Sequence, residues 1–178
     1  MKAILIVAVL ASSAFATDLA TVPLAESACG PGNVQFDVKT ESSQHPTPLA
    51  QDGKALVYVV EVFEKPGNQL AKPTTKVGLD GTWVGANKSN SYFFFPVETG
   101  DHHLCVAWQS ALKTYSKKVG LTNFSAEPGK AYYFEARITE HDEANGGAWF
   151  TLDLQPVNND EGQLLVASSA LSTFRPKK

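Results

Sequence analysis

The sequence has little cysteine and no concentration of positive charge. Two cysteines occur in 178 residues, and 15 Lys and Arg residues stand against 18 Asp and Glu residues, for a formal net charge of −3. A nucleic-acid-binding protein needs a concentrated basic face, so we expect no nucleic-acid partner. The basic residues are scattered apart from Arg175, Lys177 and Lys178 near the end, and the terminal lysines are expected to form a solvated tail.

The sequence also has no apolar run of the roughly 20 residues that a transmembrane helix needs. Its N-terminal run, Ala3–Leu10, follows Lys2 and precedes Ala14-Phe15-Ala16, a pattern after which signal peptidase cleaves. We therefore predict a signal peptide over residues 1–16, no transmembrane segment, and a mature protein that is periplasmic or secreted. A buried N-terminal strand or helix is the alternative.

Cys29 and Cys105 are the two cysteines, and an even number in an exported chain favours a disulfide bond between them. Such a bond closes a loop of roughly 75 residues and stabilises the fold by about 4 kcal/mol in the chain-entropy model. Two buried free thiols, or a lipid anchor on Cys29, are the alternatives. A lipoprotein signal has an aliphatic residue three positions before its cysteine, where this chain has Glu26. Residues 17–32 are expected to form an extended leader that contains Cys29.

Short apolar segments separated by Gly, Pro, Asn and Asp occupy most of the remaining chain, which is typical of antiparallel β proteins. Residues 33–178 therefore predict a single all-β domain, an antiparallel β-sandwich of about eight strands with a short C-terminal helix. A closed barrel is the alternative. Ala55–Glu64 is apolar on both faces up to Val60 and is expected to be a central strand, whereas Asn33–Thr40 is expected to be an uncovered edge strand.

Two hairpins are predicted between residues 76 and 108. Asp80-Gly81 tolerates the positive φ angles of a tight turn between Val77–Leu79 and Thr82–Val84. A second turn, Glu98-Thr99-Gly100, predicts that Ser91–Val97 pairs with Leu104–Trp108.

Alternation within the strands predicts which side chains face water. In Ala131–Thr139, one face carries Tyr132, Phe134, Ala136 and Ile138, so Tyr133, Glu135 and Arg137 are expected on the wet face, and Glu61 is expected to face water as well. Val119 and Leu121 are expected to point inward. After Pro156, Asn158-Asn159-Asp160 predicts a helix N-cap, and Leu164, Leu165 and Leu171 follow at helical spacing.

Five blocks occur in a fixed order from Ala55 onward: Ala55-Leu56-Val57-Tyr58, Leu79-Asp80-Gly81 with Val84-Gly85, Ser91-Tyr92-Phe93, Gly100-Asp101-His102, and Gly129-Lys130-Ala131-Tyr132-Tyr133. In this order the chain resembles a family of small exported bacterial proteins catalogued as domain of unknown function 2846. The hairpin portion also resembles the PEGA-type surface module. The resemblance implies an all-β fold in a periplasmic or outer-surface setting. It implies no reaction and no catalytic residue, because the family has no established activity.

Candidate sites are few. His102 and His103 are adjacent on a strand and point to opposite faces, so they do not chelate a metal together without a bulge. Glu140-His141-Asp142-Glu143 is expected in a solvated acidic loop. No nucleophile elbow and no phosphate-binding loop occurs. We therefore predict no catalytic, cofactor-binding or metal-binding residue.

The aromatic residues leave two interpretations open. Trp83, Trp108 and Trp149, with Tyr92, Tyr115 and Tyr133, can line a ligand groove or a sugar platform, or can pack in the core. Gly81-Thr82-Trp83 is also similar to a lipocalin motif, although here it lies in the middle of the chain. We predict a non-enzymatic binding or structural accessory module of the bacterial cell envelope, whose partner is an envelope protein or a glycan. A lipocalin-like carrier of a small apolar ligand is the alternative.

Overall fold

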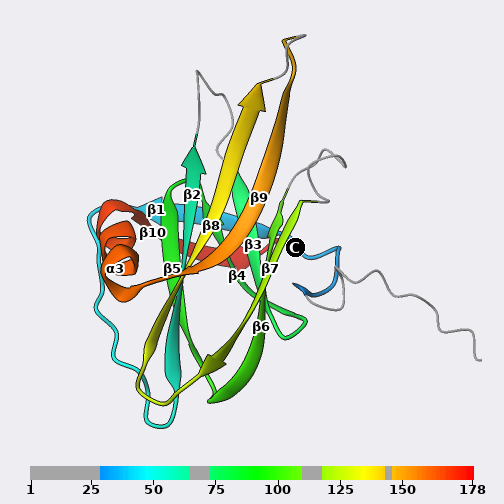
Figure 1. Ribbon diagram of the computed structural model, residues 1–178. Helices are drawn as coiled ribbons and strands as arrows, with labels where there is room; N and C mark the ends of the chain where they lie inside the picture. Colours follow the sequence, from blue (N-terminus) through cyan, green and yellow to red (C-terminus); the bar gives the residue numbers. More distant parts are fainter. Residues whose placement is uncertain (1–28, 65–72, 110–117, 143–145) are drawn as a thin grey trace, which may run out of the picture.

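The computed structural model describes residues 29–64, 73–109, 118–142 and 146–178. The predicted signal peptide and residues 17–28 of the leader lie outside this part of the chain. The described residues form two β-sheets that pack face to face, with one helix beside them (Figure 1). The elements are β1 Phe36–Glu41, β2 Ala55–Glu64, β3 Thr74–Leu79, β4 Thr82–Lys88, β5 Ser91–Val97, β6 Gly100–Trp108, β7 Val119–Ala126, β8 Ala131–Asp142, β9 Ala148–Val157, α3 Asn159–Ser168 and β10 Ala170–Pro176.

The larger sheet has six strands in the order β1-β10-β5-β2-β8-β9, and the smaller has four in the order β4-β3-β6-β7. All pairings are antiparallel except β2 with β8 and β10 with β5, which are parallel. The predicted all-β sandwich is therefore confirmed, with ten strands in the described residues instead of about eight. Each sheet is open, so the barrel alternative is wrong for this part of the chain.

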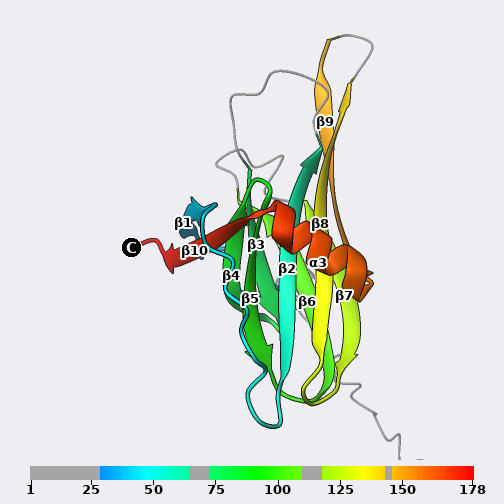
Figure 2. The same cartoon turned by 90° about the vertical axis from the view of Figure 1, so that its left-hand side faces the viewer.

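Strand β2 lies in the interior of the six-stranded sheet, as predicted from its apolar residues on both faces. Its odd-numbered side chains, such as Val57 and Val59, point into the space between the sheets, where they join Phe93, Leu104 and Phe134 in the main core. Its even-numbered side chains form a second cluster on the outer face of the same sheet, and α3 covers that cluster (Figure 2). The members of this outer cluster that are buried are Leu56, Tyr58, Val60, Tyr92 and Tyr133.

One predicted hairpin is confirmed and the other is wrong. β3 and β4 pair around Asp80 and Gly81, whose φ angles of 48° and 79° are those of a tight primed turn. By contrast, β5 pairs with β2 and β6 pairs with β3, so the turn at 98–100 carries the chain from one sheet to the other. Both strands contribute apolar residues to the same core, and alternation alone does not distinguish strands paired in one sheet from strands that face each other across it.

The C-terminal segment contains the predicted helix and then an additional strand. The side chain of Asn158 accepts a hydrogen bond from the Glu161 backbone N–H at 3.0 Å and caps α3, which ends at Ser168. Leu171, predicted in the helix, lies on β10, which pairs along its length with β1. Beyond β10, Lys177 and Lys178 are exposed, as predicted for a solvated tail, although the Lys177 backbone N–H donates to the Gln35 carbonyl. The partner strand β1 is more than a hundred residues away, so the local sequence did not reveal this pairing.

Two further predictions are settled by the fold. Cys29 and Cys105 form a disulfide bond with a Cα–Cα separation of 5.2 Å, which excludes the free-thiol and lipid-anchor alternatives. β1 lies at an edge of the six-stranded sheet, as predicted. Across the described ranges, no helix combines the length and the apolar character needed to cross a bilayer.

Candidate functional site: the outer face of β8 and β9

The outer face of the β8–β9 pair carries polar side chains along its length and an aromatic pair near one end. Cross-strand partners on this face are Glu135 with Gln155, Arg137 with Asp153, Thr139 with Thr151 and His141 with Trp149. Their neighbours in sequence, including Phe134, Ile138 and Leu152, point inward to the main core. The opposition of Trp149, Thr151 and Asp153 to the inward residues follows from strand alternation. We call these four pairs, together with Glu64, the β8–β9 strip.

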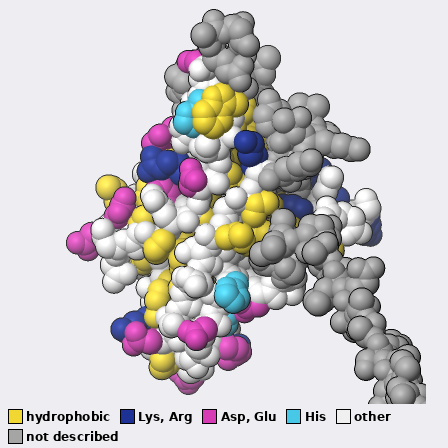
Figure 3. All heavy atoms as spheres, turned by 45° about the vertical axis from the view of Figure 1, so that its right-hand side comes forward, with side chains coloured by type: hydrophobic (Ala, Val, Ile, Leu, Met, Phe, Trp, Pro, Cys, Tyr) yellow, Lys and Arg dark blue, Asp and Glu magenta, His cyan; other side chains and the backbone are white. Residues whose placement is uncertain are grey.

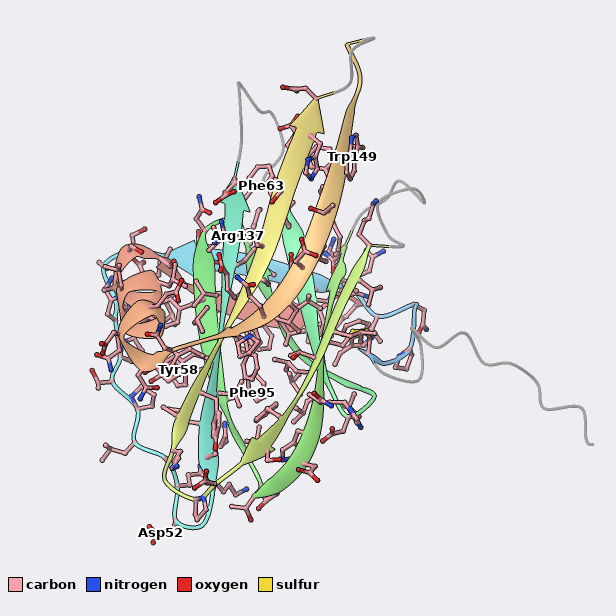
Figure 4. All side chains as sticks on the ribbon, in the orientation of Figure 1. Asp52, Tyr58, Phe63, Phe95, Arg137 and Trp149 are labelled. Atoms are coloured by element: carbon pink, nitrogen blue, oxygen red, sulfur yellow. A yellow bond between two sulfur atoms is a disulfide. The ribbon has the colours of Figure 1, made fainter. Side chains whose placement is uncertain are left out.

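Trp149 and His141 form an exposed aromatic platform at the projecting end of the strip. Their rings stack with a centroid distance of 4.0 Å and an interplanar angle of 15°. Trp149 is 45% exposed, whereas Trp108 packs edge-on against Phe150 with ring centroids 5.1 Å apart. In Figure 3 a histidine lies against a large hydrophobic side chain at this end of the molecule, and Figure 4 places Trp149 on β9 beyond the body of the sandwich. Trp149 is thus positioned to contact another molecule.

Arg137, labelled in Figure 4, lies further along the strip at the centre of a charged network. Its guanidinium pairs with Glu64 and, at 2.6 Å, with Glu135. The other oxygen of the Glu135 carboxylate accepts a hydrogen bond from the Gln155 amide at 3.0 Å. The hydrogen bond that the guanidinium donates to the Glu135 carboxylate is the main cause that raises the pKa of Arg137, and the arginine is a permanent cation.

The prediction that Glu135 faces water is wrong, since its side chain is fully buried. β8 does place it on the outer face, but α3 covers that face: Glu161 in the first turn of α3 lies close enough to act electrostatically on Arg137. Strand alternation assigns a face and not its exposure. An arginine two positions away on the same strand is the sequence signal that could have indicated a buried ion pair.

Glu61 is a second carboxyl group whose predicted exposure is wrong. It follows Val59 on the inner face of β2 and is fully buried. One of its oxygens accepts a hydrogen bond from the Ser89 N–H at 2.6 Å. Thr75 lies beside the same carboxyl group, but its hydroxyl makes no hydrogen bond within the described structure. Burial raises the pKa of Glu61 to about 7. This group belongs to the interior of the sandwich and is not accessible to a partner.

The two histidines of β6 have structural partners. The His102 ring lies 2.7 Å from an Asp80 carboxylate oxygen and 2.9 Å from the Glu98 carbonyl, and the His103 N–H donates to the other Asp80 oxygen. Partial burial opposes the charged form of His102, but the hydrogen bonds to Asp80 and Glu98 outweigh it and raise its pKa.

The acidic segment 140–143 differs from the predicted loop, because β8 continues to Asp142, while Glu143 lies outside the described residues. Among the residues that the structure describes, no group of three or more His, Cys, Asp and Glu side chains is arranged to hold a metal ion.

The other predicted aromatic residues pack against neighbouring parts of the protein. Trp83 donates a hydrogen bond to the Pro31 carbonyl at 2.8 Å, and Tyr92 and Tyr133 belong to the outer cluster beneath α3. Tyr115 lies outside the described residues. Of the three tryptophans, Trp149 alone is among the large hydrophobic residues exposed in the described structure.

Comparisons with family models, with curated proteins and with solved structures found no match to this chain. The resemblance to domain of unknown function 2846 and to the PEGA-type module therefore stays a prediction.

Proposed function

We propose that the protein is a non-enzymatic binding module of the bacterial cell envelope, and that it binds a glycan along the β8–β9 strip. The observation that carries this proposal is the stacked Trp149–His141 platform, 45% exposed at Trp149, in line with hydrogen-bonding side chains on the same face. The apolar C–H face of a sugar ring packs on an indole, while its hydroxyl groups need donors and acceptors beside it. The strip offers both.

The charges of the strip favour a neutral glycan over a polyanion. Arg137 is the cation of the network, and it is already paired with Glu64 and Glu135. An anionic ligand would have to displace these carboxylates from the guanidinium. A sugar hydroxyl can instead share the outer oxygens of Glu64 and the exposed side of Arg137, because hydroxyl groups both donate and accept.

The disulfide bond supports the export that this function requires. Bonds such as Cys29–Cys105 persist in oxidising compartments, which include the periplasm and the cell exterior. We therefore propose that the mature protein is periplasmic or secreted.

The alternative, a lipocalin-like carrier, requires an apolar cavity inside the fold. The space between the two sheets is instead filled by side chains such as Val57, Phe93 and Phe134, all of them buried. This packing favours a binding site on the surface of the protein over a ligand cavity between the sheets.

The proposal is tested by sedimentation with insoluble peptidoglycan sacculi and by titration with soluble oligomers of N-acetylglucosamine. We expect the mature protein to cosediment with sacculi, and we expect Trp149→Ala to weaken binding at least about tenfold, because an anchoring aromatic residue commonly contributes that much. Leu121→Ala is the matched control, since Leu121 is an exposed apolar residue of the other sheet.

Three outcomes would contradict the proposal. They are no binding to either glycan, equal binding by Trp149→Ala and the wild-type protein, or equal loss in the Leu121→Ala control. Capture of an envelope protein that survives Trp149→Ala would assign the partner to the protein class instead.

A further inference from the structure

A separate cleft lies on the outer face of the six-stranded sheet, between α3 and the segment that precedes β2. It has a volume of about 420 Å³, within the range of small-molecule sites. Tyr58 and Tyr133 form its floor, Val166 and Gln163 of α3 line one side, and His45 and Pro46 line the other. Asp, Glu, Lys and Arg do not occur among the lining residues.

The floor of the cleft is a rigid aromatic layer. Tyr58 stacks on Tyr133 with ring centroids 4.8 Å apart and an interplanar angle of 15°, and Phe94 packs against the other side of Tyr58 at 5.5 Å. Both tyrosines belong to the outer cluster that β2 and β8 build. Because the rings are fixed by their strands, the floor is formed before a ligand arrives, which lowers the cost of binding.

Tyr58 and Tyr133 bring two phenol groups to this floor, and Tyr92 belongs to the same outer cluster without lining the cleft. Burial, together with the neighbouring Tyr133 and Tyr92 hydroxyl groups, raises the pKa of Tyr58 to about 12, so its hydroxyl remains a neutral donor. Tyr92 is fully buried, and no protein group in the described structure accepts or donates a hydrogen bond at its hydroxyl. The His45 ring, which lines the cleft, stacks parallel to Tyr92 at 6.1 Å.

We infer that this cleft binds a small, uncharged, flat molecule that carries a hydrogen-bond acceptor such as a ring carbonyl. The aromatic floor receives its ring, and the hydroxyl groups of Tyr58 and Tyr133 donate to its acceptor. A charged ligand is disfavoured, because the lining offers no opposite charge to offset its desolvation. The inference is independent of the glycan proposal, since the cleft and the β8–β9 strip share no residue.

The inference is tested with Nile red, a neutral, flat dye with a ring carbonyl, whose fluorescence rises in apolar surroundings. We expect saturable binding of one dye per protein molecule, and much weaker binding of the anionic dye anilinonaphthalene sulfonate. Ala167→Trp fills the cleft from α3 and is expected to weaken Nile red binding at least tenfold. Leu164→Trp introduces the same side chain at an exposed position of the same helix that does not line the cleft, and is expected to bind as the wild-type protein does.

Tyr58→Phe removes one donor without changing the shape of the floor, and we expect it to weaken binding severalfold. Circular dichroism and the thermal midpoint of each variant establish that it is folded. Nonsaturable binding, or equal binding by folded Ala167→Trp and Leu164→Trp, would overturn the inference. Loss of glycan binding in Trp149→Ala leaves Nile red binding unchanged if the two sites are separate.

Discussion

The outer faces of the two sheets are covered in different ways. Residues 29–34 cover the four-stranded sheet: Cys29 is bonded to Cys105 of β6, and Lys76 donates to the Val34 carbonyl while lying over the Trp83 ring. The backbone at Cys29 lies directly against the backbone of β3, since a Cβ atom on Gly78 would be 2.2 Å from the Cys29 carbonyl oxygen. The outer face of the six-stranded sheet is covered by α3, which touches the sheet through side chains such as Leu165 and Val166.

The difference shows how the fold creates a place for a ligand. The segment at Cys29 is held by its disulfide bond to Cys105 and lies directly on Gly78 of β3, so no space is left at that point. A helix that rests on tyrosine rings stands away from the sheet, and the cleft of about 420 Å³ lies beside it. We therefore expect the covalent cover to determine stability and the noncovalent cover to determine binding.

Removal of the disulfide should give the largest change in stability. We expect the double variant Cys29→Ala, Cys105→Ala to lose about 4 kcal/mol of unfolding free energy, because the bond closes a loop with a sequence separation of 76 residues. Urea unfolding with and without reductant measures it. The variant should be insensitive to reductant and, where folded, should bind Nile red as the wild-type protein does. Equal midpoints for both proteins would contradict the role given to this cover.

Glu61, which is buried between the two sheets, should make the free energy of unfolding depend on pH. Its pKa of about 7 lies above the ordinary value of 4.5, so the folded state binds the proton more tightly than the unfolded state does. The unfolding free energy should therefore fall as pH rises from about 4.5 through 7, by about 3 kcal/mol in total. Glu61→Gln mimics the protonated form and should remove most of this fall in urea unfolding at pH 5 and pH 8.

Glu98→Gln is the control for this pH dependence, because Glu98 is exposed and pairs at the surface with Lys54. Its effect should stay within about 1 kcal/mol. An unchanged pH profile in Glu61→Gln would show that another group causes the dependence.

Gly162→Ala should give the smallest of the three changes and should disturb only the cover formed by α3. In an exposed helix this substitution stabilises by roughly 1 kcal/mol. Here the added Cβ atom would lie 2.2 Å from the Tyr133 ring, so we expect a net loss of about 1–2 kcal/mol and weaker Nile red binding as α3 is pushed from the floor of the cleft.

Leu164→Ala in the same helix serves as its control, since Leu164 is 69% exposed and should change stability by less than about 0.5 kcal/mol. Stabilisation by Gly162→Ala would show that α3 does not rest on Tyr133.

Local pattern was sufficient for most of the strands. The apolar run in Ala55–Val60 and the Asp80-Gly81 turn each depend on residues near one another in sequence, and both predictions are confirmed. The alternation in Ala131–Thr139 assigned the inward face correctly, but the predicted wet face was wrong for Tyr133 and Glu135, which are buried. The disulfide followed from the count of two cysteines in a chain predicted to be exported. Trp149 was among the predicted aromatic candidates, although nothing in its own segment distinguished it from Trp108.

Only the tertiary structure decided which faces are buried and, apart from the β3–β4 hairpin, which strands pair. β5 and β6 are adjacent in sequence but lie in different sheets, and β10 pairs with β1 from the opposite end of the chain. Leu121, predicted to point inward, is 52% exposed, whereas Glu61 and Glu135 are fully buried. The sequence by itself determined the period of each strand, because side chains alternate locally. Exposure and pairing depend on distant segments, and so the strip, the cleft and the covers were determined only when those segments packed together.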